Sequence, residues 1–109
     1  MAKRNEILEL SFEFALDIID FSELLEEQRK YIISRQILKA GTSIGANIRE
    51  AQSCESRADF IHKLKIAQKE AEETDYWLAL CEKAKKYPSP PEEIKIKILS
   101  IKKLLSKII

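Results

Sequence analysis

Residues 60–81 read FIHKLKIAQKEAEETDYWLALC, and this stretch decides the fold class. Apolar or small side chains recur in it at alternating spacings of four and three: Phe60, Leu64, Ala67, Ala71, Thr74, Leu78 and Cys81. An α-helix turns once in about 3.6 residues, so this alternation places all of them on one face. Charged residues fill the positions between them. The pattern predicts a long amphipathic helix with one buried face.

Three further stripes have helical spacing. The first follows Ile7, Ser11, Phe14, Ile18, Phe21 and Leu25, with a second row beside it at Leu8, Phe12, Ala15 and Ile19. Two adjoining rows predict a helix broad enough to contact two partner helices. The second stripe runs through Ile33, Ile37, Ala40, Ile44, Ile48 and Ala51, and the last through Ile94, Ile98, Ile101, Leu105 and Ile108. We expect helices at about residues 4–25, 29–53, 57–86 and 91–108.

Turn residues are scarce in the chain. It has two glycines and three prolines, fewer than a β protein of this length usually needs. Ser56 and Asp59 have the spacing of a capping box, and Ser89 before Pro90 predicts an N-cap with proline at the first helical position. Short connections between the helices predict an all-α, antiparallel up-down four-helix bundle, with residues 1–109 as a single domain.

Both glycines lie within the second predicted helix. A glycine in a helix interior costs roughly 1 kcal/mol relative to alanine, so Gly41 and Gly45 on one face indicate the close approach of another helix. A loop at residues 40–43 is the alternative. We favour a continuous helix because the apolar rhythm from Ile37 to Ile48 keeps its phase through the glycines.

Polar residues accompany these glycines on the same predicted helix. Together they are candidates for a subunit or helix-packing interface, which we expect to face the polar run of the third helix at residues 68–75: Gly41, Ser43, Gly45, Asn47 and Glu50. We expect Ser43 and Asn47 to make buried or interfacial hydrogen bonds. A solvated charged face is the alternative for the acidic residues.

Groups for catalysis or metal binding are sparse. A zinc site needs three or four ligands, but His62 is the only histidine, and Cys54 and Cys81 are the only cysteines. Asp59-x-x-His62 matches the Glu-x-x-His motif of di-iron bundles only partly. Residues 41–45 lack the lysine of a phosphate-binding loop. We expect no enzymatic activity, no cofactor, no metal and no small-molecule substrate.

The chain has no apolar run of the ~18 residues that a membrane span needs, and its first residues do not resemble a signal peptide. We therefore expect a cytoplasmic protein with no membrane partner. Its net charge is +1, yet residues 83–109 contain eight lysines and two glutamates. Clustered lysines bind phosphates, so these are candidates for nucleic-acid binding: Lys83, Lys85, Lys86, Lys95, Lys97, Lys102, Lys103 and Lys107. The alternative is a solvated helix face.

Several stretches resemble one known family. Residues 40–51, AGTSIGANIREA, resemble the signature of the bacterial four-helix-bundle family named for proteins encoded within 23S rRNA intervening sequences. Residues 58–64 (ADFIHKL), 69–71 (KEA) and 73–78 (ETDYWL) are similar to the third helix of that family. The resemblance covers nearly the whole chain.

The resemblance implies a bacterial cytoplasmic protein that assembles as a ring, commonly a homopentamer. It also implies kinship with the accessory variability determinant of diversity-generating retroelements, which binds a reverse transcriptase and nucleic acid through a basic surface. We therefore expect a non-enzymatic homo-oligomeric scaffold that binds RNA or an RNA-handling partner such as a reverse transcriptase. The alternative is a protein-interaction module with no nucleic-acid binding, which would dock a partner through Tyr76 and Trp77 or the acidic faces.

Overall fold

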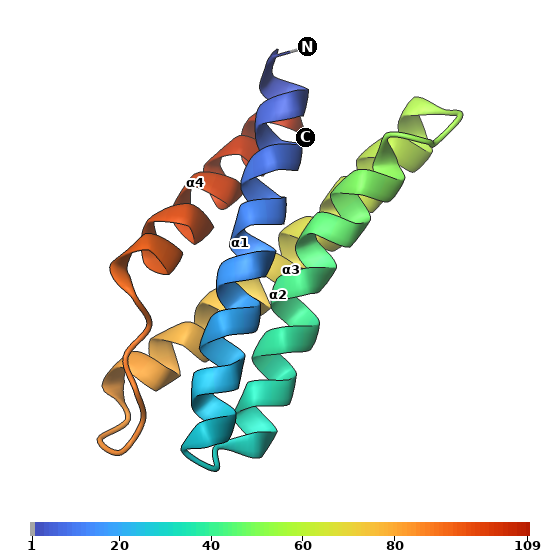
Figure 1. The fold of residues 1–109 in the computed structure, drawn as a ribbon. Coiled ribbons are helices and arrows are strands. Elements are labelled where there is room, and N and C mark those ends of the chain that lie inside the picture. The colour runs from blue at the N-terminus through green and yellow to red at the C-terminus, as the bar shows by residue number, and fades with distance from the viewer. Residues whose placement is uncertain (1) are drawn as a thin grey trace.

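The computed structural model describes the backbone of residues 2–109 and the side chains of residues 6–109. Its four helices are α1 (Ala2–Glu27), α2 (Tyr31–Ala51), α3 (Arg57–Lys83) and α4 (Glu92–Ile108). Each helix reverses the direction of the one before it (Figure 1). α1 and α3 each pack against both α2 and α4. The predicted all-α four-helix bundle is confirmed.

The core consists of the predicted apolar stripes. From α1 it takes Ile7, Phe14, Ile18, Phe21 and Leu25, and isoleucines and leucines of the other three helices close around them. Burial of each large aliphatic or aromatic side chain stabilises the fold by about 1.5–3 kcal/mol. These stripes therefore supply most of the energy that holds the helices together.

Helix α2 runs without a break through Gly41 and Gly45, so the continuous helix is confirmed and the loop is excluded. The Ser56 hydroxyl accepts a hydrogen bond from the Asp59 backbone N–H at 3.1 Å, which confirms the predicted N-cap of α3. α3 ends at Lys83, earlier than expected.

The predicted N-cap of the last helix is wrong. α4 begins at Glu92, and Pro91 is its N-cap residue, with φ −58° and ψ 151°. A proline disfavours the helical conformation in the residue before it, so Pro91 keeps Pro90 out of the helix. Ser89 therefore lies too far from the first turn to cap it.

The turn between α1 and α2 contains no glycine. The backbone N–H of Lys30 donates to the Leu25 carbonyl at 2.8 Å, and Arg29 has a positive φ of 64°. Arg29 thus occupies the left-handed position that glycine usually takes after a helix. No helix in the described part of the chain is long and apolar enough to cross a membrane.

Candidate assembly face and lysine surface

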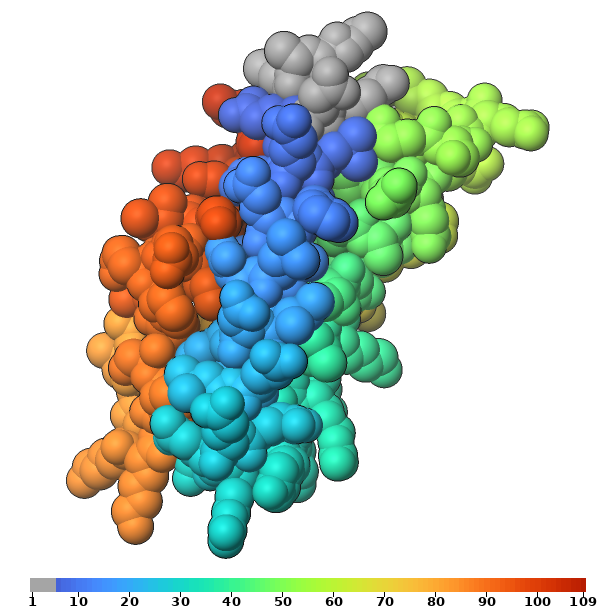
Figure 2. Space-filling view, viewed as in Figure 1, coloured from blue at the N-terminus to red at the C-terminus, as the bar shows by residue number. Residues whose placement is uncertain are grey.

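Part of the second apolar row of α1 faces outward, since Leu8 packs partly against the core but Phe12 and Ile19 are exposed. Phe12 is 58% exposed and Leu16 is 49% exposed, and Ile19 is exposed beside them. α1 contacts two helices, α2 and α4, as the sequence predicted, but Phe12 and Ile19 of the second row stay exposed. Figure 2 shows α1 running uncovered along this face between α4 and α2. We name these side chains the outer row of α1: Leu8, Phe12, Ala15, Leu16 and Ile19.

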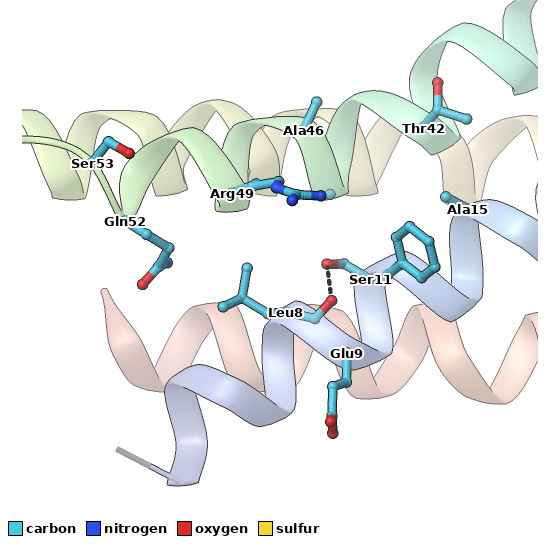
Figure 3. A pocket seen from close by; sticks show the side chains of 11 residues that line it. Leu8, Glu9, Ser11, Ala15, Thr42, Ala46, Arg49, Gln52 and Ser53 are labelled. Carbon is cyan, nitrogen blue, oxygen red and sulfur yellow. Dashed lines mark hydrogen bonds between the residues drawn. The ribbon is translucent and has the colours of Figure 1, made fainter.

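A groove of about 800 Å³ lies between the outer row of α1 and the C-terminal half of α2. Leu8, Phe12 and Ala15 line it from α1, and small residues line it from α2. Figure 3 shows the Arg49 side chain lying along α2, on the opposite side of the groove from Ser11. The Ser11 hydroxyl donates to the Leu8 carbonyl at 3.2 Å. The groove is apolar along most of its floor, with polar groups at its edges.

Gly41 and Gly45 allow α2 to pack closely against α1. A Cβ on Gly41 would lie 2.9 Å from two side-chain carbons of Ile18. A Cβ on Gly45 would lie 3.4 Å from the carbonyl and hydroxyl oxygens of Ser11. Both glycines therefore pack against α1. They do not face α3 as expected from the sequence.

The other candidate interface residues lie elsewhere on α2. The Asn47 side-chain amide donates to the Ser43 carbonyl at 2.9 Å, and both residues are half-buried. This bond stays within one helix, and contact of these two side chains with another subunit stays a prediction. Glu50 is exposed and pairs with Lys63 of α3 at 2.7 Å. This hydrogen bond raises the pKa of Lys63 above its ordinary value.

Three of the candidate lysines connect helices to one another. Lys97 contacts Asp17 of α1 at 2.6 Å, Lys102 contacts Asp75 of α3 at 2.9 Å, and Lys95 contacts Glu82 at 2.8 Å. Each hydrogen bond raises the pKa of its lysine, and the Lys95 ammonium lowers the pKa of Glu82. These ammonium groups are engaged in ion pairs within the bundle.

The remaining five candidates are exposed and have no carboxylate partner among the described side chains. Lys83, Lys85 and Lys86 lie where α3 ends and the connection to α4 begins. Lys103 and Lys107 lie on α4, near the opposite end of the bundle. The structure thus separates the predicted lysine cluster into two groups.

Sequence reasoning missed two basic residues that join the first group. Arg29 and Lys30 form the α1–α2 turn, and the Lys30 ammonium lies 4.7 Å from the centre of the Tyr87 ring. In an up-down bundle the first and third connections lie at the same end. The helix topology therefore shows that Arg29 and Lys30 lie near the lysines of the α3–α4 connection. Counting charges along the sequence could not show this.

Helix α4 also carries apolar side chains on its outward side. Ile96 is 56% exposed and Leu99 is 55% exposed. Their spacing of three places them on one face, and Lys103 and Lys107 continue that face at spacings of four. We name Ile96 and Leu99 the α4 outward pair.

The described residues contain no group of three or more histidine, cysteine, aspartate or glutamate side chains that could hold a metal ion. His62 is exposed. Both cysteines are free, and burial raises the pKa of the Cys81 thiol to about 11. A thiol with that pKa is mostly protonated at neutral pH and therefore a weak nucleophile.

The fold and surface together define a class: small up-down helical bundles whose main surface feature is an uncovered apolar face. Within that class, residues 3–107 match the model of the family described as 23S rRNA-intervening sequence protein. The chain belongs to this family, as its sequence resemblance predicted.

A crystal structure with the same fold is among the solved structures similar to this chain. It is the crystal structure of a protein of unknown function from the S23 ribosomal protein family of Bacteroides thetaiotaomicron. The two chains are 47% identical, with a TM-score of 0.90 over 97% of this chain and 96% of that one. No curated protein matches this sequence.

Proposed function

We propose that this protein is a non-enzymatic, homo-oligomeric scaffold in which the outer row of α1 forms the contact between copies. The observation that carries the proposal is the exposure of Phe12 and Leu16 on a helix whose opposite face is fully buried. Large contiguous apolar patches on a soluble protein mark interaction sites. A neighbouring copy would remove these side chains from water, at about 25 cal/mol for each Å² buried.

A closed ring of more than two copies needs two different surfaces on each copy. The α4 outward pair offers the second surface. Four exposed acids flank the outer row of α1 at helical spacing: Glu9, Glu13, Asp20 and Glu23. A two-fold contact centred on this row would bring those acids together, whereas contact with α4 would place Lys103 and Lys107 beside them. The charges therefore favour a head-to-tail ring, and the resemblance leads us to expect five copies.

Two variants test this arrangement. Phe12→Asp blocks the outer row of α1, and Leu99→Asp blocks the α4 outward pair. We expect each variant alone to be monomeric by sedimentation. An equimolar mixture should form one-to-one dimers, because the intact α4 of the first variant can meet the intact α1 of the second.

Tyr76→Asp is the matched control, because Tyr76 is exposed on α3 and belongs to neither face. This variant should keep the wild-type mass. If the two blocked variants fail to associate when mixed, the head-to-tail arrangement is wrong. If Tyr76→Asp is monomeric while the other two variants keep the wild-type mass, the assembly face has been misplaced.

We further propose that the assembly binds RNA or an RNA-handling protein such as a reverse transcriptase in the cytoplasm. The supporting observation is the set of five exposed lysines without carboxylate partners, which a ring would repeat in every copy. Anisotropy of a labelled, structured RNA tests this, and binding should weaken as salt is raised. Absence of binding at low salt would favour the alternative, a protein-interaction module that docks a partner through Tyr76 and Trp77.

A further inference from the structure

We infer that one end of the bundle, formed by the α1–α2 turn and the α3–α4 connection, binds the phosphate backbone of single-stranded nucleic acid. The inference rests on the proposed RNA binding and gives it a location. We name this surface the basic end, and it consists of Arg29, Lys30, Lys83, Lys85 and Lys86.

Two segments that are distant in the sequence form the basic end. The Lys30 ammonium stacks 4.7 Å from the Tyr87 ring centre, which joins the turn to the connection. Lys83 and Tyr87 also line one shallow cavity with Ile33 of α2. Residues 26–30 and 83–87 together carry five basic and two acidic side chains. Positive charge from both segments is therefore concentrated on one small surface.

Glu26 and Glu27, the two acids of these segments, are exposed, whereas the acids that flank the connection are held by a lysine outside the basic end. Glu82 is held by Lys95 at 2.8 Å, and Glu92 also contacts Lys95, at 3.6 Å. The backbone N–H of Tyr87 donates to the Ala84 carbonyl at 3.3 Å, so Lys85 and Lys86 occupy the middle of a turn. Both are exposed there, with no carboxylate partner among the described side chains.

Arg29 occupies a backbone conformation that does not suit arginine. Its φ of 64° lies in the left-handed region, where side chains other than glycine and asparagine are strained. Strained residues cluster at functional sites. Arg29 places a charged side chain where glycine would be unstrained. This supports a role for its guanidinium in binding phosphate groups.

The start of α2 adds to the attraction for anions. No side chain caps its first turn, and no acidic residue lies there. The backbone N–H groups and the positive end of the helix dipole thus face the same surface. Tyr31 in this first turn is exposed and can stack on an unpaired base, which favours single-stranded nucleic acid.

The test measures the affinity of the protein for a fluorescein-labelled oligouridylate of 20 nucleotides, by fluorescence anisotropy over a series of salt concentrations. We expect the double variant Lys85→Gln/Lys86→Gln to lose affinity on the order of tenfold at low salt. The slope of log affinity against log salt should also fall by about 1 to 2. Lys65→Gln/Lys69→Gln is the control, because it removes the same charge from exposed lysines in the first half of α3, away from the basic end, and should change neither quantity.

Arg29→Gly separates binding from stability. It removes a charge from the basic end but relieves the strained turn. We therefore expect weaker RNA binding together with a higher urea midpoint and an unchanged solution mass. A purely structural role for Arg29 would leave RNA affinity unaltered.

Equal losses of affinity in the Lys85/Lys86 and Lys65/Lys69 variants would show that the basic end is not the binding site, and would leave the proposed RNA binding itself standing. Failure of the wild-type protein to bind the RNA at low salt would overturn both proposals. Vesicles of equal parts phosphatidylserine and phosphatidylcholine provide the last comparison. If they bind through Lys85 and Lys86 while the RNA does not, the surface is a membrane contact and the inference is wrong.

Discussion

Gly41 and Gly45 have the same neighbour, α1, but different amounts of space beside them. A Cβ at position 41 would lie 2.9 Å from the branched side chain of Ile18, close to its backbone attachment. A Cβ at position 45 would meet Ser11 at 3.4 Å, close to an ordinary van der Waals contact. The need for glycine is therefore strong at position 41 and weak at position 45.

Alanine substitution at these two positions should have effects of opposite sign. We expect Gly41→Ala to destabilise the protein by about 1–3 kcal/mol, because the core must shift to admit the methyl group. Gly45→Ala should be neutral or stabilise it by up to about 1 kcal/mol, since alanine is the better helix former. Urea unfolding of both variants measures this, and a larger loss at position 45 would contradict the close packing described for α2.

The sequence predicted the role of these glycines only in part. Two glycines in an unbroken apolar rhythm indicated a close helix contact, which the structure shows. The identity of the partner helix could not be predicted, because the spacing of Gly41 and Gly45 does not show on which side of α2 each neighbouring helix lies. Ile18, a single side chain on a different helix, decides how close the contact is.

At the scale of the helices, hydrophobic periodicity located every element. Capping was less predictable, because the extended conformation that Pro91 imposes on Pro90 overrides the N-cap chemistry of Ser89. The exposure of Phe12 and Ile19 could not be predicted, for a different reason. A stripe of apolar residues has the same spacing whether the same chain or another molecule covers it.

Ion pairs attach α4 to both of its neighbours. Lys97 and Asp17 join α4 to α1 at 2.6 Å, and each side chain is about a quarter exposed. Lys97→Gln should therefore cost only about 0.5–1 kcal/mol, as is usual for pairs near the surface. The cost should shrink in high salt because the charges are screened. Lys103→Gln is the control, since Lys103 makes no ion pair with the described side chains.

The same pair gives a pH dependence. The hydrogen bond to Asp17 raises the pKa of Lys97 above its ordinary value of 10.5. The folded protein therefore holds this proton more tightly than the unfolded chain. The stabilisation is complete at neutral pH and is lost as the pH rises past 10.5 through the folded value. The stability difference between wild type and Lys97→Gln should shrink over that range, and a constant difference would contradict this role.

At the scale of the whole molecule, the lysine-rich C-terminal region does not form one surface. Lys95, Lys97 and Lys102 form ion pairs with carboxylates of α1 and α3. Composition alone could not distinguish these three lysines from those without a carboxylate partner. The basic end depends on residues about 55 apart in the sequence, brought together by the up-down topology. It could have been inferred only once the order and direction of the helices were known.

The central claim is that the uncovered apolar row of α1 is the contact between copies of this chain. Sedimentation equilibrium of the wild-type protein tests it most directly. We expect a single species with a mass close to five times the 12.6 kDa of one chain. That species should be lost in Phe12→Asp. A wild-type mass of 12.6 kDa at micromolar concentration would contradict the claim.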